Sequence, residues 1–405
     1  MLLGASRVEG SNPSLSANLL FMNLFQFIRN FFRQIRSSRF AYDNLIEVLV
    51  YKQAIIDNFL FFKSRFSKLE IAPVLKSNAY GHGLVQVAKI LESQKPPFYC
   101  VDSFFEALIL RNENIKTPIL IIGYTPLSNI AASRLKDLSF SVLSLNELKR
   151  LNKMITKPLC IHIKIDTGMH RHGVNLEDIE EAIALIRSNS NLRLEGAYTH
   201  LADADSESPE FTERQIKDWN KTAQRLMDEF PSLVHLHCAA TAGAIYSDKI
   251  IATTMRVGRG LYGIQVGSKK LDLKPALEMR TKITSLRKIK SGDSIGYNTT
   301  FTAEQGMTIA TIPVGYTEGL DRRLSNKGFV TIRGRQCPIV GRVSMNISSI
   351  DVSALPEVEL DDEVLVISRD SKMSNSVEYM AWLCETIAYE ILVHVPAHLR
   401  RVIIA

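Results

Sequence analysis

Between residues 45 and 263 the sequence alternates short apolar runs with longer segments of helical periodicity, and this alternation limits the fold more than any other feature. The pattern is typical of a parallel α/β fold, in which each strand is followed by a helix that covers the sheet. Eight strand–helix units predict a closed (β/α)8 barrel of the TIM type rather than an open sheet. The predicted strands are 71–76, 98–102, 118–123, 140–143, 159–165, 193–199, 234–239 and 253–257. Amphipathic segments lie between them at 84–91, 176–186 and 212–227, and a helix over 51–62 is expected before the first strand.

After Leu277 the sequence changes to β-branched runs separated by Gly, Asp and Asn turns. Strands are predicted at 308–313, 329–333, 337–343 and 363–367, with one helix at 377–387. A chain of 405 residues exceeds the size at which a single core stops growing. We therefore expect an N-terminal extension over 1–42, an α/β barrel over 43–276 and a mostly β C-terminal domain over 277–405.

Cysteine and charge patterns narrow the function classes. The five cysteines are scattered without a CxxC or other metal-ligand spacing, which favours reduced thiols and a cytoplasmic protein. The formal net charge of +7 is uneven, because residues 1–42 hold five Arg and one Glu. The rest of the chain is nearly neutral, and nothing in it indicates a nucleic-acid partner.

The first forty residues contain an apolar run, 19–32, that is interrupted by Arg29. The run is too short to span a bilayer, and most of the positive charge follows it, unlike in a signal peptide. The segment is also compatible with a basic amphipathic helix that lies on a membrane surface, but we do not expect it to insert stably into the membrane. For residues 1–21 our hypothesis is that the start codon is assigned too early and that translation starts at Met22. The reason is that Gly10-Ser-Asn-Pro13 is the peptide obtained when the nucleotides of a tRNA T-arm are translated in one frame.

A reactive lysine is predicted at the end of the first barrel strand. The apolar run 71–76 ends on Lys76 and passes directly into a short turn that contains Gly81 and Gly83. Alternation places Ala72, Val74 and Lys76 on one face, so the amine stands at the carboxyl end of a buried strand, where barrels carry their chemistry. Such a lysine can form a Schiff base and act as a base, although a lysine that snorkels at a strand end fits equally well.

The segment 74–83, Val-Leu-Lys-Ser-Asn-Ala-Tyr-Gly-His-Gly, resembles the pyridoxal-phosphate (PLP) lysine motif of bacterial alanine racemases. Later segments match the family in the same order: 164–171, 255–258, 296–297, 313–316 and 341–345. The resemblance extends from about residue 44 to the C-terminus and implies a PLP-binding barrel followed by a β domain that contributes a second catalytic base.

The resemblance implies a catalytic pair, Lys76 and Tyr297, which serve opposite faces of the substrate, with Lys76 also binding the cofactor. Arg256 is implied to face the pyridine nitrogen and, because it keeps its proton, to leave that nitrogen neutral and limit transamination. His200 is implied to link Arg256 to Tyr297. Without the motifs, Tyr297 would indicate strand packing and His200 a core histidine.

Contacts to the cofactor phosphate are also implied by matching positions. They are Tyr80, Thr241, Gly258, Arg259 and Tyr389. The chain departs from the family here, because an Asn-Ser pair common in relatives is Ala240-Thr241. The hydroxyl is retained and the amide is lost, so phosphate affinity could be weaker.

Substrate recognition is implied for three residues: Arg171 and the backbone N–H of Met345 would bind the carboxylate, and Tyr316 would narrow the opening to the site. For Arg171 a surface salt bridge is the simpler interpretation. The family has Asp after this Met, whereas this chain has Asn346. Lys164 matches a lysine that is carbamylated in some relatives.

Taken together, the resemblance implies an alanine racemase that interconverts L- and D-alanine for peptidoglycan, works as a homodimer with composite sites and needs no metal. The alternatives are a racemase of broader specificity that also accepts serine, a PLP carrier without turnover, a decarboxylase of related architecture, and a metal-dependent barrel hydrolase. The hydrolase rests on two His-x-His pairs, His170/His172 and His235/His237, which chance produces easily in strands.

Overall fold

The computed structural model describes residues 43–265 and 271–405, of which 46–405 belong to one compact unit. The apolar run 19–32 and the expected start at Met22 lie outside the described residues. Among the residues it describes, no helix combines the length and apolarity needed to cross a bilayer. All five cysteines carry free thiols.

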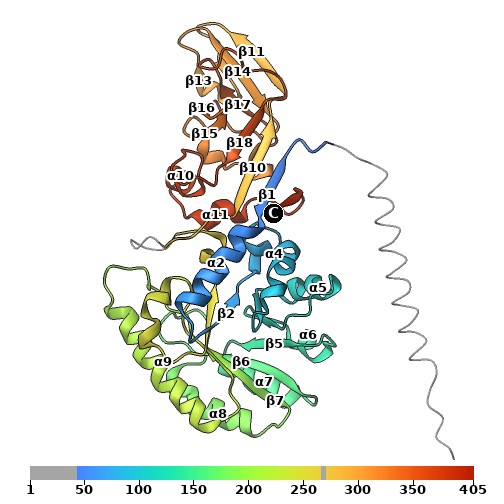
Figure 1. The fold of residues 1–405 in the computed structure, drawn as a ribbon. Helices are drawn as coiled ribbons and strands as arrows, with labels where there is room; N and C mark the ends of the chain where they lie inside the picture. The colour runs from blue at the N-terminus through green and yellow to red at the C-terminus, as the bar shows by residue number, and fades with distance from the viewer. Residues whose placement is uncertain (1–42, 266–270) are drawn as a thin grey trace, which may run out of the picture. The chain divides into compact units, whose positions relative to one another are not determined.

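Eight parallel strands form the first half of this unit, which confirms the predicted barrel (Figure 1). Strands β3 to β8 pair in chain order, and β2 pairs with β9 in a register that places Ala72 opposite Arg256. Val74 bridges to Cys100 on one side, and the Arg256 N–H donates to the Ala239 carbonyl (3.1 Å) on the other, so the ring is closed. The strands are β2 (Glu70–Pro73), β3 (Tyr99–Val101), β4 (Ile119–Ile121), β5 (Leu138–Val142), β6 (Leu159–Lys164), β7 (Leu192–Tyr198), β8 (His235–His237) and β9 (Thr254–Val257).

Helices follow the strands and cover the ring from outside (Figure 1). Their apolar faces explain the burial, as in α9, where Ile216, Trp219, Ala223 and Leu226 recur at helical spacing and are buried. Serine caps begin two of them, with the Ser144 hydroxyl accepting from the Glu147 N–H at the start of α7. The helices are α2 (Lys52–Arg65), α4 (Leu84–Leu91), α5 (Phe104–Asn112), α6 (Leu127–Ala132), α7 (Leu145–Met154), α8 (Ile179–Arg187) and α9 (Glu210–Glu229).

The C-terminal half is mostly β, as predicted, and its main sheet has nine strands in the order β11-β14-β17-β16-β15-β18-β10-β1-β19. Strand β1 (Glu47–Tyr51) comes from the other end of the chain and lies between β10, to which it is antiparallel, and β19, to which it is parallel. The remaining strands are β10 (Leu277–Lys282), β11 (Ser285–Ile289), β14 (Met307–Ile312), β15 (Phe329–Ile332), β16 (Arg335–Val340), β17 (Ser348–Asp351), β18 (Glu363–Ile367) and β19 (Arg401–Ile404).

The helix predicted over 377–387 begins where expected but is too long: α10 (Val377–Leu383) ends at Leu383, and a second helix, α11 (Ala388–Val393), follows. Glu385 takes a left-handed φ of 54° and Ile387 is extended, which interrupts the helical hydrogen bonds. The Thr386 hydroxyl then donates to the Glu390 carboxylate in the first turn of α11.

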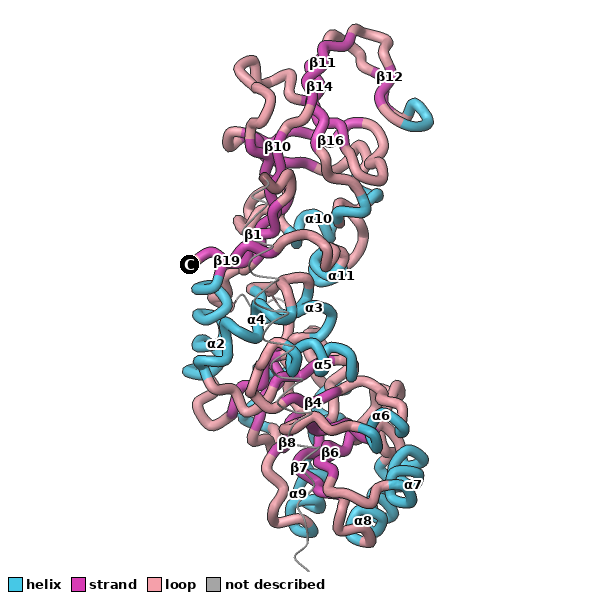
Figure 2. The backbone as a smooth tube through the Cα atoms, turned by 90° about the vertical axis from the view of Figure 1, so that its right-hand side faces the viewer, coloured by secondary structure: helices cyan, strands magenta, loops and turns pink. Residues whose placement is uncertain are grey.

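The β half touches the barrel next to Lys76. Figure 2 shows α11 beside α3, the short turn Lys76–Tyr80 that follows β2. The Arg401 guanidinium of β19 donates to the Gly81 carbonyl (2.7 and 3.1 Å). A Cβ on Gly81 would lie 2.1 Å from the Leu392 carbonyl oxygen, so only glycine fits this contact. The domain bounds 43–276 and 277–405 remain a prediction. Strand β1 belongs to the first range by sequence, but it pairs with β10 in the sheet of the second range.

Candidate active site

The chain after Lys76 follows a left-handed turn. Strand β2 ends at Pro73 rather than at the predicted residue 76, and four non-glycine residues, 77–80, have φ between 51° and 55°. Each such residue costs about 1–2 kcal/mol in an L-polypeptide, so the turn persists only because its surroundings hold it. The Ser77 N–H donates to Glu106 Oε1 (2.7 Å), and Asn78 Oδ1 accepts from the Leu84 N–H (2.9 Å). Strain is thus concentrated next to the predicted catalytic amine.

Arg256 is buried inside the barrel near its carboxyl end and contacts only neutral groups. Its Nη2 donates to the Thr199 carbonyl (2.8 Å) and lies 3.3 Å from His200 Nδ1. Its Nη1 lies 2.7 Å from His237 Nδ1. Burial lowers the pKa of Arg256 from its ordinary value, but a guanidinium keeps its proton in proteins. The guanidinium is therefore a fixed cation with several donors and, among the residues that the structure describes, no carboxylate partner of its own.

Four predicted site cations act on one histidine. The pKa of His200 is lowered to about 3, first by burial and then by the positive charges of Arg256, Lys164, Arg171 and Lys76. The pKa of Lys164 is lowered to about 8 by burial and by Arg171 and Arg256. These residues therefore share one electrostatic environment at the carboxyl end of the strands. Its positive potential favours an anionic ligand such as a carboxylate.

The predicted phosphate contacts come together beside this cluster. A Cβ on Gly258 would lie 2.8 Å from the Tyr80 hydroxyl, so glycine leaves the backbone open at this point. The Gly260 N–H donates to Thr241 Oγ1 (3.3 Å). Burial raises the pKa of Tyr80 to about 12, which keeps its hydroxyl a neutral donor. Backbone N–H groups and hydroxyls of this kind suit a phosphate.

Arg259 and Tyr389 complete the same cradle. The Arg259 guanidinium lies 5.9 Å above the Tyr389 ring, and that ring lies 6.5 Å from the Tyr80 ring. Arg259 Nη2 also pairs with Asp205 Oδ2 (2.8 Å). Asp205 was missed by the sequence analysis, because it belongs to an exposed loop without a motif. It offsets part of the positive charge that Arg259 brings.

The loop after β6 carries Arg171 out of the barrel. Asp166 Oδ1 accepts the N–H groups of Gly168 and Met169 (both 2.9 Å) and of His170 (3.1 Å), which folds the loop back on itself. Arg171 itself is exposed. Within 43–265 and 271–405 Arg171 forms no ion pair, so the surface salt bridge considered above is not observed; the pair in this loop is His170–Asp166 (3.8 Å).

Three predicted site residues lie apart from this cluster, on the β half. Tyr297, Tyr316 and Met345 are 68%, 44% and 57% exposed. Tyr297 follows Gly296, whose φ is 72°, at the tip of the hairpin formed by β12 (Ser294–Ile295) and β13 (Phe301–Thr302). Within 43–265 and 271–405 no hydrogen bond joins these three side chains to the Lys76 cluster. An exposed tyrosine on a hairpin tip is available to another molecule.

The departure at Asn346 has a local explanation. Its Nδ2 donates to Glu318 Oε1 (2.8 Å), and Glu318 Oε2 accepts from the Gly315 N–H (2.9 Å). The Tyr316 N–H in turn donates to the Ser344 carbonyl (3.1 Å). Asn346 thus braces the loop that carries Tyr316 and Met345.

The two His-x-His pairs do not assemble a metal centre in the described part of the chain. His170 and His172 are exposed, and His237 is bonded to Arg256 and His162. Among the described residues, one group of carboxylates and histidine lies close enough together to suit a metal ion. It consists of Asp321, Glu390 and His394 and belongs to the β half. Arg323 already contacts both of its carboxylates (2.6 and 2.9 Å).

Comparisons with known proteins agree with this arrangement. The family models for the alanine racemase N-terminal and C-terminal domains match residues 50–266 and 276–403. Alanine racemase 1 of Caldanaerobacter subterraneus subsp. tengcongensis is 35% identical over 363 residues, which cover 88% of this chain and 94% of the relative. Alanine racemase of Sorangium cellulosum is 34% identical over 350 residues, 83% of this chain and 92% of its own.

Solved structures give the same result. Alanine racemase of Clostridium difficile 630 superposes with a TM-score of 0.84 at 28% identity, covering 90% of this chain and 97% of that one. Alanine racemase from Bacillus anthracis with bound L-Ala-P gives a TM-score of 0.83 at 30% identity, covering 90% and 96%. Because the family models span both halves and the relatives match over most of their length, the chain belongs to the alanine racemase family.

Proposed function

We propose that this chain interconverts L- and D-alanine with PLP as cofactor, using Lys76 and Tyr297 as the two bases. The observation that carries the proposal is the placement of Lys76 and the buried Arg256 at one end of the barrel, next to the cradle around Gly258. The family is generally PLP-dependent, which supports the same cofactor here. Racemisation of serine alongside alanine is the alternative.

The residues fit the cofactor part by part. Tyr80, Thr241, Gly258, Arg259 and Tyr389 would hold the phosphate, and the open backbone at Gly258 leaves room for it. Arg256 would donate to the pyridine nitrogen, and Lys76 would bind the aldehyde carbon. When bound, PLP withdraws electrons from the substrate Cα and makes its proton removable. With Ala240 in place of Asn, the cradle lacks one side-chain donor.

The remaining residues orient substrate and protons. Arg171 and the Met345 N–H would bind the carboxylate, and Tyr316 would restrict the opening to small amino acids. His200, kept neutral by burial and by neighbouring cations, accepts from Arg256 through Nδ1 and can therefore donate through Nε2 to the Tyr297 oxygen. A hydrogen bond of that kind stabilises the phenolate that a tyrosine base requires.

The exposure of Tyr297 supports a head-to-tail homodimer in which each chain donates this base to its partner's site. We further propose that the enzyme is cytoplasmic and supplies D-alanine for peptidoglycan. The test uses the purified full-length protein and a chiral assay across amino acids. A yellow, borohydride-bleachable protein that racemises alanine supports the proposal. A colourless protein that leaves alanine unchanged with added PLP contradicts it.

Replacing Arg256 with Glu is expected to slow racemisation and to raise the share of transamination. A carboxylate would stabilise the protonated pyridine nitrogen, so electron withdrawal would increase. The measurement is the ratio of pyruvate to inverted alanine. Arg259→Glu is the matched control, since it weakens phosphate binding without touching the nitrogen. An unchanged ratio in Arg256→Glu would remove Arg256 from this role.

Lys164 is expected to be carbamylated. Only the free amine reacts with CO2, and a pKa of about 8 gives Lys164 much more free amine near neutral pH than a lysine at its ordinary value of ~10.4. At fixed CO2 pressure a 13C carbamate signal should therefore rise as the pH increases through 8. The signal should vanish in Lys164→Gln, and its persistence there would assign it to another amine.

A further inference from the structure

A chain of polar contacts, two hydrogen bonds and one histidine–carboxylate contact at 3.4 Å, runs through the barrel interior from Arg256 to Glu195. His237 Nδ1 lies 2.7 Å from Arg256 Nη1, and His237 Nε2 lies 2.8 Å from His162 Nδ1. His162 Nε2 lies 3.4 Å from Glu195 Oε2, which also accepts from the Ser139 hydroxyl. The two imidazoles are 1% and 0% exposed. The chain thus joins β9, β8, β6, β7 and β5 across the ring.

The two ends of this chain determine the direction of every bond in it. Arginine can only donate, and an ionised carboxylate can only accept. His237 must therefore accept at Nδ1 and donate from Nε2, and His162 must do the same. Any other tautomer would place two hydrogens or two lone pairs face to face. Burial lowers the pKa of both imidazoles, and the His162 hydrogen bond is the main reason that the pKa of Glu195 falls to about 2.

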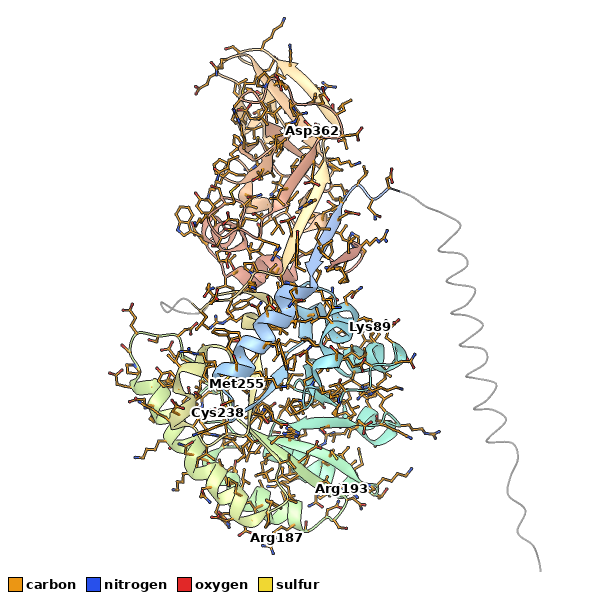
Figure 3. All side chains as sticks on the ribbon, in the orientation of Figure 1. Lys89, Arg187, Arg193, Cys238, Met255 and Asp362 are labelled. Atoms are coloured by element: carbon orange, nitrogen blue, oxygen red, sulfur yellow. The ribbon has the colours of Figure 1, made fainter. Side chains whose placement is uncertain are left out.

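The two histidines also connect the positive charge of Arg256 to the negative charge of Glu195. A buried cation without a carboxylate is costly, and none of the hydrogen-bond acceptors of Arg256 is a carboxylate. Glu195 is the middle residue of β7, before the carboxyl end of the strand, and its side chain is 37% exposed. In Figure 3, Cys238, next to His237, lies within the barrel, and Arg193, two residues before Glu195, lies at its lower edge.

We propose, on the basis of the function proposed above, that Glu195, His162 and His237 are positioning residues that fix the guanidinium of Arg256 toward the cofactor's ring nitrogen. Arg256 and the carboxylate at the other end of this chain of contacts impose the same tautomer on each imidazole, so the carboxylate helps to select the form of His237 that leaves a lone pair for Arg256. The reaction is thereby adjusted by a residue that touches neither substrate nor cofactor.

The barrel offers matched controls. His235 lies two residues before His237, and its ring stacks on the His162 ring with centroids 5.8 Å apart. It faces Thr254 Oγ1 (3.2 Å) and Glu70 (3.7 Å) and takes no part in the chain. If His162 and Glu195 merely fill space, His235 and Glu70 should be equally sensitive to substitution.

The first experiment records 15N solid-state NMR of the histidine-labelled, cofactor-free full chain. We expect His162 and His237 as neutral Nε2–H tautomers in the wild type and in Glu70→Gln. In Glu195→Gln the amide NH2 can donate to His162 Nε2, which opposes the direction that Arg256 imposes from the other end, so we expect a second tautomer beside the wild-type one. A charged or Nδ1–H form of either histidine in the wild type would contradict the hydrogen-bond direction derived above. Identical spectra for Glu195→Gln and the wild type would overturn the selecting role of the carboxylate.

The second experiment compares the loaded enzymes. In Glu195→Gln and His162→Gln, kcat should fall about ten-fold, as is usual for residues that orient a functional group, with the KM for alanine unchanged and the transamination share raised. Glu70→Gln and His235→Gln should keep the wild-type ratio of products. Each variant is compared with its control, Glu195→Gln with Glu70→Gln and His162→Gln with His235→Gln. Equal effects on the product ratio in both comparisons would show a purely structural role. Thermal unfolding identifies a variant that does not fold, and if His162→Gln fails to fold, the comparison of Glu195→Gln with Glu70→Gln decides. A wild type that neither binds PLP nor racemises alanine contradicts the proposed function, whereas the NMR result on cofactor-free protein still decides the chain.

Discussion

Lys76→Ala is expected to abolish both the yellow colour of the PLP-loaded protein and its racemase activity. The loss of rate should be about 10³-fold or more, as for removal of a nucleophile in other enzymes. No other amine stands in the turn after β2, and Lys164, the other lysine of the cluster, belongs to β6 and lies beside Arg171. Absorbance after PLP addition and a chiral alanine assay measure the two losses.

The matched control for this substitution is Lys89→Ala. Lys89 is a surface lysine of α4 that pairs with Glu113 (3.0 Å) and is 53% exposed (Figure 3). We expect this variant to keep its colour and activity, because exposed pairs contribute little. A Lys76→Ala protein that racemises alanine at near the wild-type rate would show that the catalytic amine is elsewhere.

Mixing Lys76→Ala chains with Tyr297→Phe chains is expected to restore activity from two inactive parents. If Tyr297 reaches the partner's site, each mixed dimer has one site without either base and one site with both. Random exchange makes about half of the dimers mixed, so about a quarter of all sites are intact in a symmetric two-fold assembly. The racemase rate per site after exchange is the measurement.

The control mixture combines Lys76→Ala with the double variant Lys76→Ala/Tyr297→Phe, which has no intact Lys76 in any pairing and should stay inactive. Tagged pull-down confirms that chains have exchanged. Continued inactivity of the first mixture after confirmed exchange would mean that Tyr297 works within its own chain or not at all.

Local patterns were sufficient for the barrel. The eight strands are short apolar runs bounded by turns, and the helix predicted over 84–91 has the same bounds in the structure because its apolar face repeats at helical spacing. The motifs predicted Lys76 and Tyr80, Thr241 and Arg256 as site residues, and these come from three segments that gather at one end of the ring. That meeting follows from the parallel strands, whose carboxyl ends all face one way.

Features that depend on distant contacts could not be predicted in this way. The left-handed turn at 77–80 is unfavourable by itself and is held by Glu106 and Arg401, which come from other parts of the chain. The pair His235/His237 was interpreted as chance, because its partners His162 and Glu195 are brought to it only by strand pairing. Hydrophobic patterning likewise cannot show that β1 pairs across the whole length of the chain.

The position of β1 has a consequence for biosynthesis. Val48, Leu49 and Val50 leave the ribosome early, whereas the two neighbours of this strand begin only at Leu277 (β10) and at Arg401 (β19). Until then an apolar strand with two unpaired edges must stay available without pairing elsewhere. A fragment that begins at Leu277 lacks the strand that joins β10 to β19, and a chain that stops before Arg401 leaves β1 at an open edge. Completion of this sheet therefore waits for the last strand to be synthesised.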